Sequence, residues 1–285
     1  MMKIIHICLC GPVTDGWSYQ ENLLSKYHKK AGLDVTVIAS LWVWNESGEM
    51  VKTSKQEYVN QDGVHIVRLK TKNDRPVFYR FKRYLGLYEV IEKICPDILF
   101  VHGVQFLDIT LIIKYAKSHP NVKIYADNHA DFSNSAANWL SKNILHKIIW
   151  RHYAKKIEPY TTKFYGVLPA RVDFLKSVYG LPEEKCELLV MGADDDEVKK
   201  AKKPEMRAEK RKEYGLTDSD FVIMTGGKID HNKRETLQLM DAVNAISDRN
   251  IKLLVFGSVV PELSEEFESR LSEKVRYIGW KKSED

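Results

Sequence analysis

The group Asp127-Asn-His129-Ala-Asp131 places an imidazole between two carboxylates, directly after a predicted strand at 122–126. Neighbouring carboxylates can orient a histidine or keep it charged near neutral pH, which suits acid–base chemistry or charge stabilisation. A hydrogen-bonded structural histidine is the alternative that this pattern leaves open. Neither a helical histidine pair nor a cysteine cluster accompanies the group, so the sequence predicts no metal site.

Two glycines, Gly226 and Gly227, follow another predicted strand and precede Lys228. A helix is expected to begin at Asn232, a good capping residue, with Lys233 on its first turn. Two ammonium groups and a helix N-terminus would then converge, as binding of a diphosphate requires. Each cation–anion pair is worth on the order of 4 kcal/mol at about 4 Å and an effective dielectric near 20, before desolvation. Two solvated lysines at a helix start are the alternative.

A third candidate is the turn at 11–18, where Gly16 would let the backbone approach a ligand. Ser18 and Glu21 resemble a capping box for the helix that follows, and the N–H groups of a helix start favour an anion. The turn lacks the three-glycine dinucleotide fingerprint, so an enzyme that uses a nicotinamide or flavin becomes a distant alternative.

Buried strands that alternate with amphipathic helices predict an α/β fold with parallel sheets. In such sheets ligands bind beyond the carboxyl ends of the strands, which is why the three groups above are candidates. The predicted strands are 3–10, 34–40, 64–69, 97–101, 122–126, 163–168, 187–191, 221–225, 251–256 and 275–278, and the predicted helices include 76–94, 107–118, 232–246 and 262–271.

The length of 285 residues predicts one complete α/β domain and part of another. We expect a first Rossmann-like domain at 1–200, a charged linker at 201–217 and a partial second domain at 218–285. The acidic run Asp194–Glu197 at the edge of this connection is interpreted as a solvated loop.

Composition and charge distribution indicate where in the cell the protein acts. The net charge, 44 − 39 = +5, is modestly basic. An uninterrupted apolar run of about 18 residues is missing, and the first residues lack a secretory signal, so we expect a cytoplasmic protein without a spanning helix. Two basic segments that contain bulky apolar residues, 75–88 and 142–157, predict peripheral contact with the anionic inner face of a membrane; solvated helix faces are the alternative. No nucleic-acid-binding module is recognised.

The order of these pieces resembles glycosyltransferase family 4, whose members have two facing Rossmann-like domains (the GT-B fold). The resemblance is carried by Asp15-Gly-Trp-Ser-Tyr-Gln-Glu-Asn-Leu23, Asn128-His129, Leu189-Val-Met-Gly192-Ala-Asp194, Gly226-Gly-Lys228 with Lys233, Phe256-Gly257 and Tyr277-Ile-Gly279.

The resemblance implies that His129 lines the reacting centre, and that Lys228 and Lys233 bind the donor diphosphate. Lys228 stands where the family usually has an arginine, which replaces a bidentate fork by a point charge. Donor contacts are also implied for Gly16, Gly226 and Gly227, and acceptor-side roles are expected for Asp15, Trp17, Tyr19 and Asp131. Neither a metal nor a cofactor is expected. The chain ends before the family's Glu pair, so the second domain is expected to be incomplete.

The sequence therefore predicts a retaining glycosyltransferase that moves a sugar from a nucleotide diphosphate sugar to a glycan or lipid-linked acceptor. A binding or assembly subunit that needs a partner chain for donor binding is the alternative from another class.

Overall fold

The computed structural model describes residues 1–285 except 46–48, 74–81, 137, 232–233 and 282–285. Its contacts divide the chain into two compact units, the first of Met1–Asn45 and Met50–Ala193, the second built on Asp194–Asp285. Each unit has its own parallel sheet and its own hydrophobic core. The predicted α/β fold class is confirmed.

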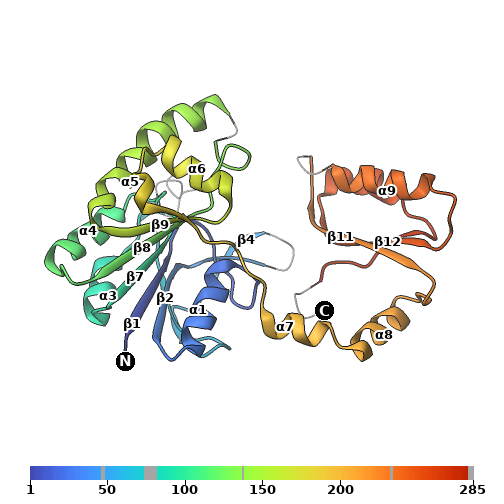
Figure 1. The fold of residues 1–285 in the computed structure, drawn as a ribbon, viewed down its shortest axis with the longest axis horizontal. Helices are drawn as coiled ribbons and strands as arrows, with labels where there is room; N and C mark the ends of the chain where they lie inside the picture. Colours follow the sequence, from blue (N-terminus) through green and yellow to red (C-terminus); the bar gives the residue numbers. More distant parts are fainter. Residues whose placement is uncertain (46–48, 74–81, 137, 232–233, 282–285) are drawn as a thin grey trace. The chain divides into compact units, whose positions relative to one another are not determined.

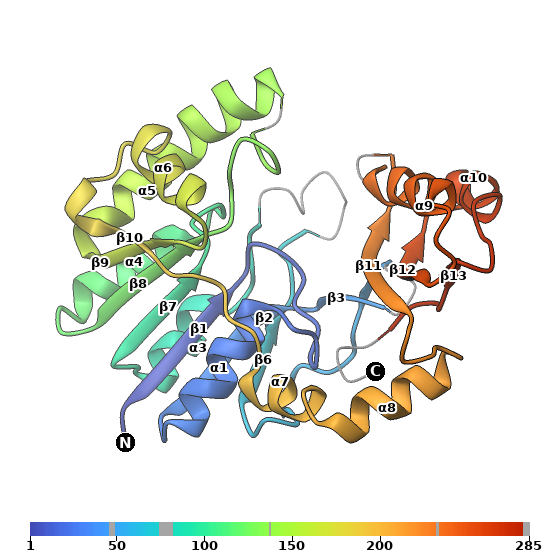
Figure 2. The same cartoon turned by 45° about the vertical axis from the view of Figure 1, so that its right-hand side comes forward.

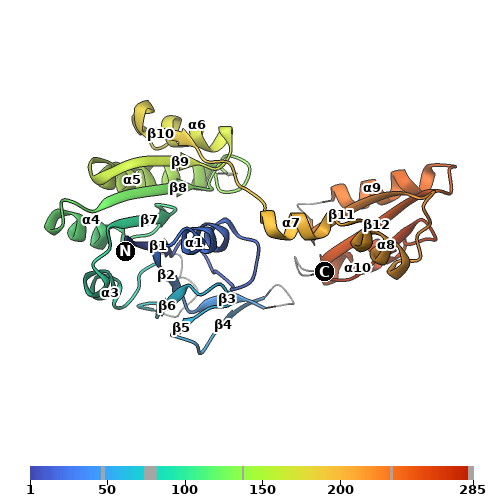
Figure 3. The same ribbon diagram turned by 60° about the horizontal axis from the view of Figure 1, so that its bottom comes forward.

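The sheet of the first unit has eight strands in the order β10-β9-β8-β7-β1-β2-β6-β5, and Figure 3 shows them stacked in that order. Every neighbouring pair is parallel except β5 with β6, and β3 and β4 form a separate antiparallel pair. The strands are β1 (Lys3–Cys8), β2 (Asp34–Ser40), β3 (Trp42–Trp44), β4 (Met50–Lys52), β5 (Glu57–Val59), β6 (His65–Leu69), β7 (Ile98–His102), β8 (Lys123–Asn128), β9 (Thr161–Gly166) and β10 (Cys186–Leu188).

Helices cover both faces of this sheet, as the near-continuous apolar character of its central strands requires. Figures 1 and 2 show α1 on one side of β1 and β2, and α3 and α4 on the other. The helices of the unit are α1 (Gln20–Lys30), α3 (Leu87–Ile94), α4 (Ile109–Ser118), the π-helix Ser141–Trp150, α5 (Arg151–Ile157), α6 (Pro169–Ser177) and two single turns of 3₁₀-helix, Glu158–Tyr160 and Glu183–Lys185.

Alternation along β1 assigns its residues to the two faces. Ile5 and Ile7 belong to the larger core, which α3, α4, α5 and α6 complete, whereas Ile4 and Cys8 belong to the smaller core on the α1 side. His6 lies between Ile5 and Ile7 and therefore points toward α1, although it is fully buried. A titratable side chain thus occupies a core position.

The π-helix Ser141–Trp150 runs directly into α5. Few of its side chains pack into the core: His146 and Trp150 are buried, whereas most of its other apolar side chains are exposed. A π-helix of this length is unusual, since i→i+5 hydrogen bonding mostly occurs as single-turn bulges.

The second unit has a parallel sheet of three strands, β11 (Phe221–Ile229), β12 (Ile251–Val259) and β13 (Val275–Tyr277). Figure 2 shows α9 and α10 beside this sheet, and Met240 and Phe267 from these helices pack with Leu253 in its core. The helices are α7 (Asp195–Ala201), α8 (Pro204–Glu213), α9 (Glu235–Ala245), α10 (Ser264–Glu268) and one 3₁₀ turn, Pro261–Leu263. The segment 201–217, expected as a linker, therefore contains α8.

Several predicted boundaries were wrong. The helix expected at 76–94 begins only at Leu87, after Gly86 in a left-handed conformation; its first residues, 76–81, lie outside the described residues. Tyr84 forms an isolated bridge with Thr71 and is buried, so this segment is fixed by tertiary contacts before the helix begins. The acidic residues at 195–197 form the first turn of α7, and Asp194 caps it through a bond from the N–H of Asp196 at 3.1 Å.

Candidate active site

The clearest cluster of chemical groups lies where β7 and β8 end. His102 is the last residue of β7, and it pairs in register with Asp127 of β8. Asn128 ends β8 and His129 follows it. Because the two strands are parallel, these side chains emerge at the same edge of the sheet, where ligands bind in folds of this kind.

Asp127 connects the two histidines. One carboxylate oxygen, Oδ2, accepts a hydrogen bond from Nδ1 of His102 at 2.7 Å and lies 3.4 Å from Nε2 of His129 in an ion pair. The other oxygen, Oδ1, accepts the N–H of Gly103 at 3.1 Å. The Asp127 side chain is fully buried, whereas 34% of the His129 side chain is exposed. His129 is therefore the member of this triad that can meet a ligand.

Asp127 and His129 stabilise each other's charged form. Burial by itself would raise the pKa of Asp127, but the adjoining His102 and His129 outweigh it and hold that pKa well below its ordinary range. Burial would likewise lower the pKa of His129, yet its contact with Asp127, helped by the charge of Glu21, raises it above the ordinary histidine value. The contact with Asp127 therefore favours the charged form of His129.

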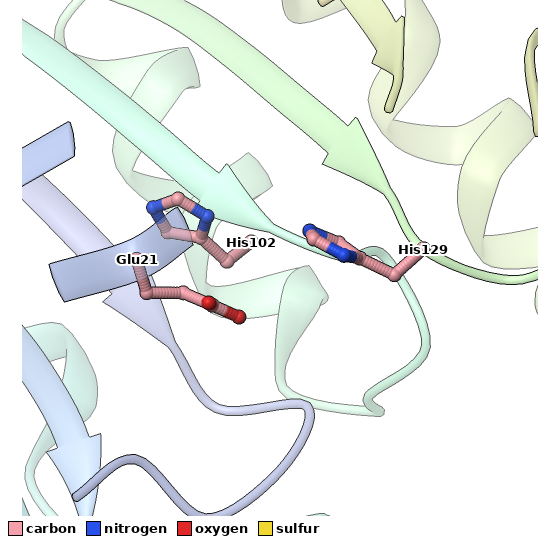
Figure 4. Close-up of side chains that lie close together, drawn as sticks. All are labelled: Glu21, His102 and His129. Atoms are coloured by element: carbon pink, nitrogen blue, oxygen red, sulfur yellow. The ribbon is translucent and has the colours of Figure 1, made fainter. Parts of the chain in front are cut away.

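Helix α1 contributes Glu21 and His28, which lie two helical turns apart on its sheet-facing side. The predicted capping box was wrong. The residue that precedes the helix is Tyr19 and not Ser18, and it makes no side-chain cap. The Glu21 carboxylate therefore takes no part in capping this helix. Figure 4 shows the Glu21 carboxylate directed toward the imidazoles of His102 and His129.

Glu21, His102 and His129 each have a donor atom within 4.8 Å of the others, which is a loose arrangement for a metal ion. Both ring nitrogens of His102 already have partners, however, Nδ1 on Asp127 and Nε2 on His6 at 2.9 Å. A metal would have to displace one of them. The observed contacts therefore fit a hydrogen-bonded chain better than a metal centre.

Asp127 and His129 were predicted from the sequence, whereas His6, His28 and His102 were not. His6 and His102 sit inside or at the end of apolar strands, where a polar residue on a core-facing position is the available signal. Only the topology, which places β7 beside β1, shows that they are neighbours.

In the turn at 11–18, Gly16 adopts a left-handed conformation with φ of 76°, as expected for a residue that lets the backbone turn sharply. Asp15 is held by Arg68, whose Nη2 lies 3.3 Å away, and by the hydroxyl of Tyr58. Arg68 is buried and also donates to the carbonyls of Val13 and Ser40, at 3.0 Å each. The Asp15 carboxylate thus anchors this turn.

The aromatic residues of the turn are partly open. Trp17 and Tyr19 are both partly exposed, and their rings lie 5.5 Å apart. Burial raises the pKa of Tyr19 to about 12, so its hydroxyl stays protonated as a hydrogen-bond donor. Both rings can therefore be reached from solvent.

Asp131 is engaged in its own loop. Its Oδ1 accepts bonds from the backbone and hydroxyl of Ser133, at 2.7 and 2.5 Å, and from the N–H of Asn134 at 3.1 Å. Its Oδ2 accepts from Nε of Arg171 at 3.0 Å. These contacts give Asp131 a structural role in the loop that follows His129.

In the second unit, the predicted glycine turn is instead part of a strand. β11 continues to Ile229, so that Gly226, Gly227 and Lys228 pair with Phe256, Gly257 and Ser258 of β12. A Cβ on Gly226 would lie 2.4 Å from the Phe256 ring, so this glycine makes room for an aromatic side chain. The expected turn was wrong because a strand can hold two glycines where its neighbour needs space.

Lys228 has an exposed side chain (61%), and its Nζ lies 3.9 Å from a carboxylate oxygen of Asp230. Asn232 and Lys233 lie outside the described residues. The residue that precedes α9 is Arg234, which makes no side-chain cap, so the helix begins three residues later than predicted.

Within the described part of the chain, no helix is both long and apolar enough to cross a bilayer.

Scans against protein-family models and against curated proteins find no match. Solved structures are similar over nearly the whole chain. A glycosyltransferase from Rickettsia africae ESF-5 matches with a TM-score of 0.61 at 16% identity, covering 99% of this chain and 69% of that one. Anabaena Alr3699/HepE in complex with UDP matches with a TM-score of 0.63 at 11% identity, covering 99% and 70%. UDP-GlcNAc 2-epimerase from Neisseria meningitidis, bound to UDP-GlcNAc, matches with a TM-score of 0.57 at 12% identity, covering 99% and 74%. These likenesses show a GT-B fold.

Proposed function

We propose that this chain is a retaining glycosyltransferase of the family 4 type, which transfers a sugar from a nucleotide diphosphate sugar to a hydroxyl of a glycan or lipid-linked acceptor. The observation that carries the proposal is the partly exposed His129, ion-paired with buried Asp127 at the carboxyl edge of the larger sheet. Structural neighbours crystallised with UDP or a UDP-sugar support a nucleotide sugar as donor.

In the proposed reaction the bond between the anomeric carbon and the diphosphate oxygen breaks, the acceptor oxygen forms the new bond to that carbon, and the acceptor's proton passes to the departing diphosphate. The sugar acquires oxocarbenium character, so stabilising negative charge on the leaving diphosphate matters most. We assign that role to Lys228 and Lys233, and we place His129 beside the transferred sugar. Asp230 competes for Lys228, because their charged atoms lie 3.9 Å apart.

Nucleotide binding tests the donor half of this proposal. We expect a nucleoside diphosphate at 100 times its Kd to stabilise the chain by about 2.7 kcal/mol, which raises Tm in a thermal-shift screen. Lys228→Ala should reduce this effect. Lys252→Ala, at the amino end of the neighbouring strand, is the matched control and should not. Absence of a shift with every nucleoside diphosphate would contradict the proposal.

Product analysis tests the chemistry. Acceptor-dependent release of the nucleoside diphosphate, with the anomeric configuration retained by NMR, is the expected result. Conversion of the donor sugar without any acceptor would instead favour an epimerase, a class that also occurs among the neighbours. A binding or assembly subunit would show no nucleotide binding by calorimetry.

We also propose that the surface around the π-helix contacts an anionic bilayer. Large apolar side chains are exposed there, with Trp139 at 72%, Leu140 at 62% and Ile148 at 61%. The stretch 132–157 contains five lysines and arginines and no acidic residue. Lys147 of the π-helix, with Arg151 and Lys155 of α5, lines a surface hollow of about 580 Å³. Apolar contact combined with cationic charge is what binds an interfacial helix to anionic lipid.

The other predicted membrane segment, 75–88, has less support. Residues 75–81 lie outside the described residues, and Tyr84 and Leu87 are buried in the core.

Vesicle sedimentation tests the π-helix surface. We expect binding to anionic vesicles that weakens at high salt, and loss of binding for the double variant Trp139→Ser with Ile148→Ser. Phe221→Ser, which removes a similarly exposed ring (67%) from the second unit, is the control. Equal sedimentation of all three proteins, or none with anionic vesicles at low salt, would contradict this part of the proposal.

A further inference from the structure

Behind His129 lies a row of histidines that the proposed function does not use. His28 Nδ1 is 2.9 Å from His6 Nε2, and His6 Nδ1 is 2.9 Å from His102 Nε2. His102 Nδ1 then meets Asp127 at 2.7 Å. The row starts at the partly exposed His28 of α1, continues along the face of β1 and β7 that α1 covers, and ends at His129.

The carboxylate fixes which nitrogens carry protons. Ionised Asp127 can only accept, so His102 donates from Nδ1, and its Nε2 is left to accept from His6 when the ring is neutral. By the same reasoning His6 donates from Nδ1 and accepts at Nε2 from His28. A neutral row therefore satisfies all three contacts with every N–H directed toward Asp127.

Burial determines which histidine of the row can carry a positive charge at low desolvation cost. His6 is fully buried and has only histidine rings at its two nitrogens, so an imidazolium there would lose its hydration without gaining a carboxylate partner. Burial, reinforced by the neighbouring rings, lowers the pKa of His6 well below its ordinary value, and burial also lowers that of His28. His129 is partly hydrated and shares the same carboxylate oxygen as His102.

We infer that His6 and His102 are positioning residues: through Asp127 they orient the carboxylate that favours the charged form of His129, the partly exposed end of the row. His102 and the N–H of Gly103 together fix both oxygens of the carboxylate, so that it is aimed at His129. For its catalytic consequence this inference rests on the proposed function, because a fixed imidazolium would present one positive charge beside the reacting sugar.

The charged groups around His129 come from four elements. Asp127 on β8 and Glu21 on α1 favour its charged form, whereas Arg171 on α6 opposes it. Arg171 is itself paired with Asp131 at 3.0 Å, which weakens its effect. His102 on β7 acts through Asp127.

The test is an NMR titration of the histidine rings in the full chain, with His129→Gln used to assign the His129 signal. In the wild type we expect His129 to titrate above the ordinary midpoint of about 6.5, and His6 to stay neutral between pH 5.5 and 8.5 in ¹⁵N tautomer spectra, with its proton on Nδ1. A charged His6 in this range, or a His129 midpoint below the ordinary value, would overturn the inference without any variant.

Variants then test the coupling. Asp127→Asn should lower the His129 midpoint by about one unit or more. His102→Gln, whose amide corresponds to Nε2, should lower it less, and His102→Asn, whose amide replaces the Nδ1 donor, should restore it. His152→Gln, at an exposed histidine of α5, is the control. An unchanged midpoint in a folded Asp127→Asn variant would refute the inference.

The NMR readout needs no substrate, so its failure is distinct from failure of the proposed function. If both hold, kcat/KM should fall as pH rises through the His129 midpoint, and the fall should move to lower pH in His102→Gln.

Discussion

Replacing Asp131 by Asn separates a structural role from an acceptor-binding role for that residue. The Asp131 side chain is 9% exposed and faces Arg171 at 3.0 Å. Burial would raise its pKa, but the hydroxyl of Ser133, the Arg171 guanidinium and the backbone N–H groups of Ser133 and Asn134 outweigh it and lower the pKa from 3.8 to about 2. Asn keeps the shape and an acceptor oxygen but removes the charge.

The magnitude follows from linkage. At 1.36 kcal/mol for each pKa unit, the difference between 3.8 and about 2 corresponds to about 2 kcal/mol of stability. Because the pKa is depressed in the folded state, this stabilisation is present above the unfolded pKa and is lost as pH falls toward 2. We therefore expect Asp131→Asn to cost about 2 kcal/mol at pH 7 and progressively less between pH 4 and pH 2.

Urea unfolding at a series of pH values, followed by the fluorescence of buried Trp150, measures this difference in the first unit. Asp173→Asn, which removes a 72% exposed carboxylate from α6, is the matched control and should change stability little at any pH. A cost that stays constant as pH falls would refute the electrostatic reasoning. A variant of unchanged stability with a raised KM for acceptor would instead favour the acceptor-side role.

Three further outcomes are expected. Gly226→Ala should destabilise the second unit by about 1–3 kcal/mol because its Cβ meets the Phe256 ring, whereas Gly11→Ala, with open space around it, should be tolerated; equal thermal shifts would contradict the packing argument. Arg68→Lys should leave buried carbonyl groups unpaired at a cost of about 1–3 kcal/mol and speed proteolysis at 11–18, and an unchanged cleavage rate would speak against anchoring by Arg68. Asp194→Ala should remove the cap of α7 at a cost of about 1 kcal/mol, measured as faster amide exchange at 195–201; unchanged exchange would show that the cap contributes nothing.

Most strands of the first unit could be predicted from the sequence, because buried parallel strands are continuous apolar runs between turns. Boundaries were predicted less well where tertiary contacts decide them. β11 extends through Gly226 and Gly227 because β12 offers pairing partners up to Val259, and local sequence contains no sign of that partner. The π-helix also escaped prediction, since its basic and apolar residues do not follow the usual helical period.

The candidate site was predictable only in part. Asp127 and His129 are adjacent in sequence and follow a strand, so local pattern found them. His6 and His102 are 96 residues apart, and their contact depends on strand order in the folded sheet. The carboxylates of Asp15 and Asp131 look equally available in the sequence, but Arg68 and Arg171, far away along the chain, engage them.

The hydrogen-bonding period of the π-helix determines how its outer surface is composed. Exposed apolar pairs occur at Trp139 and Leu140, at Ile144 and Leu145, and at Ile148 and Ile149, so they recur four or five residues apart. An ordinary helix of 3.6 residues per turn would spread these pairs around its circumference, whereas i→i+5 bonding brings them closer to a single line. Deleting one polar residue from this helix would thus move the exposed apolar pairs to different sides of it, although the same apolar side chains would remain.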